Sequence, residues 1–409
     1  MNPLLKLVAA QPHRNLAATF VAYVGDPHSV DLVQRFALEQ GITNAVVKGG
    51  RIGEAIEHLT MMPRSPSYLI VDVSATPMPL SELERLAAVC EPSVTVIVIG
   101  DANDVGLFRN LLEIGVHDYL VKPLTVELLR RSLHTSSNAQ PVRRARTGKV
   151  IGFAGTRGGV GVTTIAASLA RHLSGVANRR IAFIDLNLHG GAANTLLGLK
   201  SNNGLLDVLR DADRLDPQFV ERSLVAHDNR LFVLSAELPY GEQFQPHERA
   251  LTDLLERLKP HFHYILLDLP GQGHPLAHTA LAAAQMLYLV ADASIHSARE
   301  VLRLTRHFDS RERAPSLSVL LNAPNAAPTG RLKKADFATA TGRNVLLELP
   351  FDGAALAAAE NLAQPLAPGK SRFGDVIGEL ANSLSGQPPS AAPRWHARWH
   401  TRFTRRRSK

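Results

Sequence analysis

The sequence predicts an α/β protein with two parallel-sheet, three-layer domains. Apolar runs of strand length alternate with segments of helical length, both before and after a polar, basic stretch that contains Pro141. A chain of 409 residues is long enough for two such domains. We therefore predict an N-terminal extension, a first domain, a linker, a second domain and a basic tail, with the bounds 1–16, 17–135, 136–148, 149–385 and 386–409.

Continuous apolar runs predict the strands of both domains, because a strand covered by helices on both faces does not alternate with polar residues. In the first domain the runs are 19–24, 44–47, 68–71, 94–99 and 118–121. In the second domain they are 149–154, 180–188, 264–271 and 316–322, and a helix is predicted at 165–173.

Composition limits the compartment and the partners. The single cysteine, Cys90, excludes an internal disulfide and an all-cysteine zinc site. No apolar run approaches the roughly 18 residues of a membrane helix, so we expect a cytoplasmic protein. The tail from 386 onwards contains seven Arg and Lys residues and no acidic one, and therefore accounts for +7 of the net charge of +8. The rest of the chain is near neutral, which disfavours a general nucleic-acid binding protein.

A glycine-rich loop at 155–164 is the strongest functional signal. It reads Gly-Thr-Arg-Gly-Gly-Val-Gly-Val-Thr-Thr and lies between a predicted strand and a predicted helix. Such a turn directs backbone N–H groups and a helix N-terminus at one point, where an anion binds. A phosphate-binding loop usually has a lysine before the Ser/Thr that binds Mg²⁺, and here that position is Val162. Asp185 and Asn187 end one strand run and Asp268 ends another, and a carboxylate at such a strand end can hold the Mg²⁺ shell.

The second domain resembles the ParA/MinD family of deviant P-loop ATPases over roughly 149–385. The family signature is Lys-Gly-Gly-Val-Gly-Lys-Thr-Thr, and 157–164 read Arg-Gly-Gly-Val-Gly-Val-Thr-Thr. The resemblance implies ATP and Mg²⁺ as cofactors and a homodimer that encloses the nucleotide. The nucleotide-binding residues that it implies are Arg157, Gly158, Gly159, Val160, Gly161, Val162, Thr163, Thr164 and Asn322.

The same resemblance implies individual roles. Thr163 would ligate Mg²⁺, Asp268 would hold a magnesium-bound water, and Thr164 would bond the α-phosphate. Asn322 would contact the adenine edge. Arg157 takes the place of the lysine that reaches across the dimer, and it keeps the charge with a different geometry.

Two departures from the family pattern predict weak or no hydrolysis. Val162 removes a charge-assisted phosphate contact worth about 1.5–3 kcal/mol. Asn187 replaces the second acid of the pair that orients the attacking water, at a typical cost of about 10²–10⁴ in rate. Asp185 is the remaining catalytic candidate. The alternative is a vestigial turn that binds nothing.

The first domain resembles a response-regulator receiver. Asp72 ends the third strand, where receivers have the phosphoacceptor, Asp26 follows the first strand, and Lys122 follows the fifth. Receivers usually have a second acid beside Asp26 and a hydroxyl residue after the fourth strand, but these positions are Gly25 and Gly100. We interpret the domain as an inactive pseudo-receiver used for docking. A working receiver is the alternative.

The combination of both domains resembles the TadZ/CpaE proteins of the tight-adherence (Flp-type) pilus assembly system. The segment 99–123 is especially similar. The resemblance implies a localisation factor that forms a homodimer and recruits secretion components, at a cell pole or the inner face of the membrane. Two alternatives are a DNA-partitioning ATPase and a phosphorylation-controlled regulator with an ATPase output.

The basic tail predicts a membrane-surface helix. Trp395, Trp399 and Phe403 recur every four residues and share one helical face. Arginines flank this stripe, so that 394–407 suits an anionic membrane surface. The alternative is a disordered cationic tail that contacts membrane or nucleic acid nonspecifically, or nothing.

Overall fold

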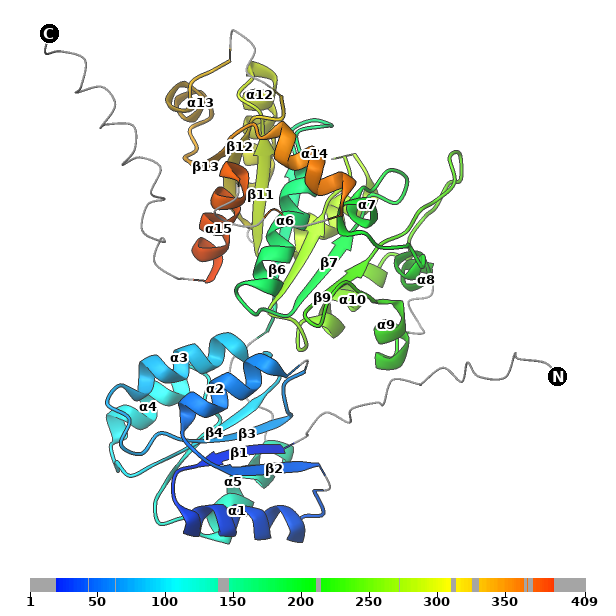
Figure 1. Ribbon diagram of the computed structural model, residues 1–409. Coiled ribbons are helices and arrows are strands. Elements are labelled where there is room, and N and C mark those ends of the chain that lie inside the picture. Colours follow the sequence, from blue (N-terminus) through cyan, green and yellow to red (C-terminus); the bar gives the residue numbers. More distant parts are fainter. Residues whose placement is uncertain are drawn as a thin grey trace, which may run out of the picture. The chain divides into compact units, whose positions relative to one another are not determined.

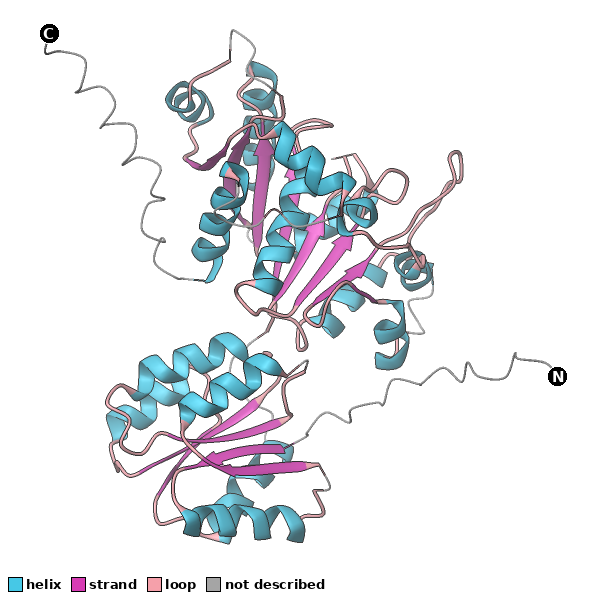
Figure 2. Cartoon of the chain, in the orientation of Figure 1, coloured by secondary structure: helices cyan, strands magenta, loops and turns pink. Residues whose placement is uncertain are grey.

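The computed structural model describes residues 20–42, 44–62, 64–138, 147–210, 215–271, 273–309, 314–325, 331–363, 366 and 371–385. The chain divides into two compact units between Ala145 and Arg146. Each unit has a largely parallel sheet with helices on both faces (Figure 1, Figure 2), so the predicted fold class is confirmed. The predicted N-terminal extension, most of the predicted linker and the basic tail lie outside the described residues.

The first unit contains a five-stranded parallel sheet with the order β2-β1-β3-β4-β5. This is the flavodoxin-like order of a receiver-like domain. All five strands fall at the predicted runs: β1 (Phe20–Val24), β2 (Ala45–Gly49), β3 (Tyr68–Asp72), β4 (Thr95–Gly100) and β5 (Asp118–Val121).

Helices cover both faces of this sheet because successive strand side chains point in opposite directions. In β1, Phe20, Ala22 and Val24 pack on the side of α1 and α5, whereas Val21 and Tyr23 pack on the side of α2, α3 and α4. The helices are α1 (Pro27–Glu39), α2 (Ile52–Met61), α3 (Pro79–Val89), α4 (Val105–Glu113) and α5 (Val126–Asn138).

The second unit contains an eight-stranded sheet with the order β13-β12-β11-β6-β10-β7-β9-β8. Every neighbouring pair is parallel except β8 with β9. Four strands fall at the predicted runs, namely β6 (Lys149–Gly155), β7 (Ile181–Asp185), β10 (Tyr264–Asp268) and β12 (Ser316–Asn322). The others are β8 (Val225–Ala226), β9 (Leu231–Leu234), β11 (Met286–Ala291) and β13 (Val345–Leu349).

The apolar core of the second unit fills both sides of its sheet. One face carries α6 (Val162–Gly175), α7 (Ala193–Leu197) and α15 (Arg372–Ser385), and α6 contains the predicted helix 165–173. The opposite face carries α8 (Gly204–Arg210), α9 (Pro217–Ser223), α10 (Ala250–Leu258), α11 (Pro275–Ala283), α12 (Ile295–Asp309) and α13 (Lys334–Thr341). The remaining helix is α14 (Gly353–Asn361).

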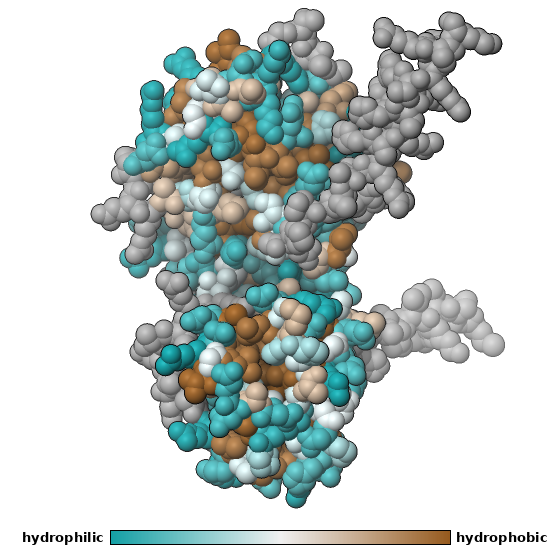
Figure 3. Space-filling model, turned by 90° about the vertical axis from the view of Figure 1, so that its left-hand side faces the viewer, coloured by the Kyte–Doolittle hydropathy of each residue, from teal (hydrophilic) through white to brown (hydrophobic). Residues whose placement is uncertain are grey.

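The surface of each unit is mixed. Figure 3 shows hydrophilic residues around separate groups of hydrophobic ones. Such scattered apolar exposure is usual for folded domains. Within the described part of the chain, no helix has the length and apolar character needed to cross a bilayer.

Candidate functional site

The glycine loop connects β6 to α6, and its curvature requires two of its glycines. Gly159 has φ +75° and Gly161 has φ +93°, a region that side chains rarely allow. A Cβ on Gly161 would lie 2.5 Å from Nδ2 of Asn322. Nδ2 of Asn322 donates a hydrogen bond of 2.7 Å to the carbonyl oxygen of Val160, whose own side chain is fully buried. The Asn322 side chain of β12 therefore holds the loop in place through the backbone of Val160.

Val162 occupies the position of the usual loop lysine and begins α6. Its side chain packs against the apolar core below the loop. Its Cγ2 atom would lie 2.9 Å from a Cβ on Gly155, so Gly155 leaves room for this methyl group. Position 162 therefore supplies packing and no charge.

Asp185 and Asp268 end neighbouring strands and are partners in the register between β7 and β10. Both are buried, with 2% exposed surface each. Burial raises the pKa of Asp268 to about 8, and the charge of Asp185 adds to this effect while a hydrogen bond with Thr163 opposes it. Burial also raises the pKa of Asp185 to about 6, although its oxygens accept hydrogen bonds from N–H of Asn187 and Ala193.

The geometry fits a divalent cation. Oδ2 of Asp268 is buried without a hydrogen-bond partner, and an interaction with the Thr163 hydroxyl lowers the pKa of the same carboxyl group. A carboxylate and a hydroxyl are the hard oxygen ligands that Mg²⁺ prefers. The structure thus brings together Thr163 and Asp268, which were predicted to hold Mg²⁺, and places Asp185 beside them.

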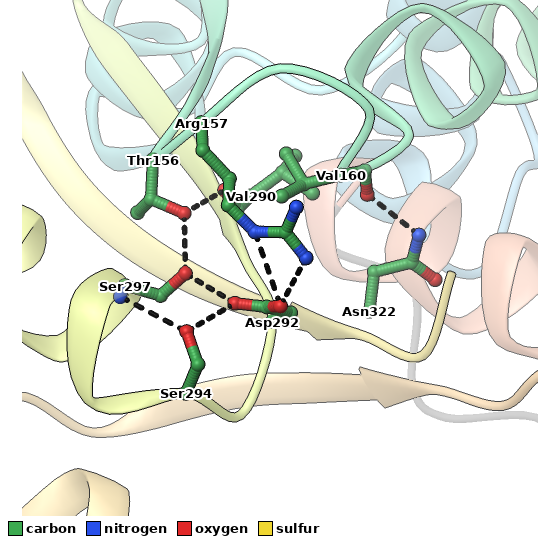
Figure 4. A network of polar contacts seen from close by, with 8 residues as sticks. All are labelled: Thr156, Arg157, Val160, Val290, Asp292, Ser294, Ser297 and Asn322. Atoms are coloured by element: carbon green, nitrogen blue, oxygen red, sulfur yellow. Dashed lines mark hydrogen bonds and ion pairs between the residues drawn. The ribbon is translucent and has the colours of Figure 1, made fainter. Parts of the chain in front are cut away.

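Arg157 has a partner that the sequence did not reveal. Its Nη2 and Nε atoms lie 2.5 and 3.2 Å from Oδ2 of Asp292. Asp292 follows β11 and, with Ser294 and Ser297, forms a polar network beside the loop (Figure 4). The sequence does contain a signal for an acid at this place. The apolar run of β11 is followed directly by Asp292, much as the run of β10 ends in Asp268.

In the first unit, the structure brings together the three predicted receiver-like residues. Nζ of Lys122 lies 2.7 Å from Oδ2 of Asp72 and 3.0 Å from Oδ2 of Asp26. Asp72 also accepts hydrogen bonds of 2.8 Å from the N–H groups of Gly25 and Ser74. Burial works to raise the pKa of Asp72, but the bonds from Lys122 and Ser74 lower it overall. The carboxylate is therefore ionised, and each of its oxygens accepts at least one hydrogen bond from the chain.

Tyr119 fills the space beside Gly100, where receivers have a hydroxyl residue. A Cβ on Gly100 would collide with Oη of Tyr119. The Tyr119 hydroxyl donates a hydrogen bond of 2.8 Å to the carbonyl oxygen of Ala102, and the residue is buried. Glycine at position 100 is thus what allows the tyrosine ring to point inward.

Comparisons with known proteins agree with the fold and the loop. Residues 148–317 match a family model described as "AAA domain". The septum site-determining protein MinD of Thermotoga maritima is 25% identical over 251 residues, which are 59% of this chain and 89% of that protein. The structure of MinD from Pyrococcus horikoshii complexed with Mg-ADP has a TM-score of 0.51 and 18% identity, and the match covers 58% of this chain and 96% of that one.

A pilus protein is also similar over a shorter stretch. The CpaE2 pilus assembly protein of Sinorhizobium meliloti 1021 is 32% identical, covering 28% of this chain and 96% of that one, with a TM-score of 0.27. The second unit is thus similar to AAA domains over residues 148–317 and to MinD, and its glycine loop agrees with both similarities.

Proposed function

We propose that the second unit binds ATP with Mg²⁺ and hydrolyses it weakly or not at all, and that the chain is a localisation and assembly scaffold for a Flp/Tad pilus secretion system. One observation supports the proposal that the loop binds a nucleotide. The loop keeps its glycine geometry and its contact between Thr163 and Asp268, but position 162 is a packed valine. Phosphate binding by backbone N–H groups is thus retained without the usual lysine charge.

The loop glycines Gly158, Gly159 and Gly161 would present their N–H groups to the phosphates, and Thr164 would bond the α-phosphate. Thr163 and Asp268 would hold Mg²⁺, which neutralises phosphate charge when bound. Asn322 would contact the adenine edge, although its Nδ2 already donates to Val160. These roles rest on the sequence resemblance and on the placement of the residues around the loop.

Weak hydrolysis follows from the two substitutions. Asn187 has no carboxylate to orient a water, and Asp185 is buried with both oxygens bonded to backbone N–H groups. This argues against a DNA-partitioning ATPase that depends on turnover. Gly25 and Gly100, which replace the second acid and the hydroxyl residue of receivers, argue likewise against a phosphorylation-controlled regulator.

The scaffold role rests on the sequence resemblance to the TadZ/CpaE proteins. In this proposal the chain acts as a homodimer in the cytoplasm, recruits secretion components and contacts the membrane or a cell pole through 394–407. These tail residues lie outside the described part of the chain.

Nucleotide binding is tested by calorimetric titration of the full chain with Mg–ATP. We expect binding by the unaltered chain and its loss in Gly161→Val, because this position has φ +93° and a Cβ there would meet Asn322. Gly175→Ala is the matched control, since a Cβ at that end of α6 meets nothing within 4 Å. Failure of the unaltered chain to bind, or turnover at the rate of lysine-bearing relatives, would contradict the proposal.

The scaffold role is tested in a deletion strain of the source organism. Loss of surface pili, restored by the full chain and by Gly175→Ala but not by Gly161→Val, is the expected result. Normal pili in the deletion strain would remove this part of the proposal while leaving nucleotide binding untouched.

A further inference from the structure

Arg157 is the only charged side chain of the loop 155–164, and an acid of the same chain holds it. Its guanidinium contacts Oδ2 of Asp292 through two nitrogens, at 2.5 and 3.2 Å. The two residues are close because β6 and β11 are neighbours, with Gly155 opposite Val290 in the register. The loop therefore has a cation whose charge is already balanced.

The carboxylate of Asp292 is held in place by hydroxyl groups. Its Oδ1 accepts hydrogen bonds from Ser294 Oγ at 2.7 Å and from Ser297 Oγ. Ser297 is fully buried, and its hydroxyl also lies 2.8 Å from Oγ1 of Thr156 (Figure 4). Burial works to raise the pKa of Asp292, but these bonds and Arg157 lower it to about 2. The acid is therefore ionised at neutral pH and cannot turn away from Arg157 without breaking the network.

The two partners differ in exposure. The Asp292 side chain is 8% exposed, whereas that of Arg157 is 42% exposed. A guanidinium can bind a phosphate through two parallel hydrogen bonds, as it binds a carboxylate. A nucleotide phosphate, whether in this loop or in that of a partner subunit, and Asp292 would consequently compete for the same guanidinium, and Asp292 already binds it.

We propose that Asp292 is a positioning residue that withholds Arg157 from nucleotide phosphate and so lowers the affinity of the loop. This inference rests on the proposed function, namely that the loop binds a nucleotide. The chemical class of ligand is a nucleoside polyphosphate with Mg²⁺, and Asp292 sets its affinity from outside the phosphate cradle.

The first test measures Mg–ATP affinity by calorimetric titration of full-length variants. Asp292→Asn keeps an oxygen for the serine hydroxyls but cannot pair with Arg157, and we expect about ten-fold tighter binding from one freed charge-assisted contact. The double variant Arg157→Gln/Asp292→Asn should lose the gain seen in Asp292→Asn, because it has no guanidinium that the change at Asp292 could free. Asp309→Asn, which breaks the pair of Asp309 with Arg343, is the matched control and should change nothing.

The second test needs no nucleotide. Phenylglyoxal attacks arginine more slowly when a carboxylate holds the guanidinium, and mass spectrometry of the peptide that contains residue 157 reports its rate. We expect Arg157 to react faster in Asp292→Asn than in the unaltered chain, with no change in Asp309→Asn. Circular dichroism checks that each variant is folded.

The outcomes separate the two ideas. Unchanged or weaker Mg–ATP binding in Asp292→Asn overturns this inference and leaves the proposed function standing, as does a gain that persists in the double variant. An unchanged reactivity of Arg157 also overturns it. If neither the unaltered chain nor Asp292→Asn binds Mg–ATP, both the inference and the proposed nucleotide function fail.

Discussion

The two units place a pair of acids in the same part of similar folds but treat their charges in opposite ways. Asp26 and Asp72 in the first unit share the ammonium group of Lys122, and the pKa of each acid is lowered despite burial. In the second unit, Asp185 and Asp268 form no ion pair with any described residue, and burial raises the pKa of each. The first unit supplies its own cation, whereas the second has a site suited to an external one. Strand ends create such sites, but neighbouring side chains decide whether they are closed or open.

Lys122→Met should have the largest effect, because it removes the internal cation of the first unit. Asp72 is 1% exposed and would remain as a buried charge without its partner. Breaking such a pair typically costs about 3–5 kcal/mol, and we expect the lower end because Lys122 is partly exposed. Urea unfolding of the full chain, followed by hydrogen exchange of β3, measures the loss.

The control for this substitution is Lys122→Met/Asp72→Asn, which removes both charges and should recover most of the stability. An equal loss in the single and double variants would mean that packing of the Lys122 stem matters more than the charge.

Val162→Lys tests the opposite change by giving the loop of the second unit a cation. A charge-assisted phosphate contact is worth about 1.5–3 kcal/mol, so Mg–ATP should bind about 10- to 100-fold more tightly. Val162→Met provides an uncharged side chain of similar length. A comparable gain with methionine would show that chain length, and not charge, limits binding.

The pH dependence of stability should differ between the units. The pKa of Asp268 is about 8 in the folded chain and about 3.9 in an unfolded one, so unfolding releases a proton between these values. The free energy of unfolding should therefore fall as pH rises from 6 to 8, by up to about 1.4 kcal/mol per pH unit, and level off above pH 8. Asp72, whose pKa is lowered, contributes no such slope in this range because it is ionised in both states.

Urea unfolding at pH 6, 7 and 8 without divalent cations, followed by hydrogen exchange of β10 and β3, measures both units in one chain. Asp268→Asn should remove most of the slope at β10, leaving the smaller contribution of Asp185, and added Mg²⁺ should reduce the slope because the cation favours the ionised carboxylate. If stability depended on pH equally at β10 and β3, the proposed electrostatic difference between the two units would be wrong.

Tyr119→Phe should have the smallest effect. The ring still fills the space beside Gly100, and only the hydrogen bond to the carbonyl oxygen of Ala102 is lost. A typical hydrogen bond contributes about 0.5–1.5 kcal/mol, and hydrogen exchange of β4 and β5 should report a loss in that range. Gly100→Ala should destabilise the first unit more, since its Cβ and the ring cannot occupy the same space. The reverse order would show that the inward position of Tyr119 does not depend on glycine.

Much of the fold and part of the site follow from local patterns. The apolar runs located all five strands of the first unit and four of the second, because a strand buried on both faces leaves a continuous apolar segment in the sequence. The same patterns placed Asp72, Asp185 and Asp268 at strand ends. The spacing of glycines located the loop, and Val162 and Asn187 were visible as departures from a known signature.

Other features depend on which strands become neighbours. Arg157 and Asp292 are 135 residues apart, and they pair because the chain places β11 beside β6. Asn322 holds the loop through Val160 from a strand 162 residues away. The inward tyrosine beside Gly100 and the raised pKa of Asp268 likewise arise from contacts across strands. The sequence by itself determined the elements and the loop, since these follow from local periodicity and spacing. Only the tertiary structure decided which charges are paired, because pairing and burial depend on strand order and on the low dielectric of the assembled core.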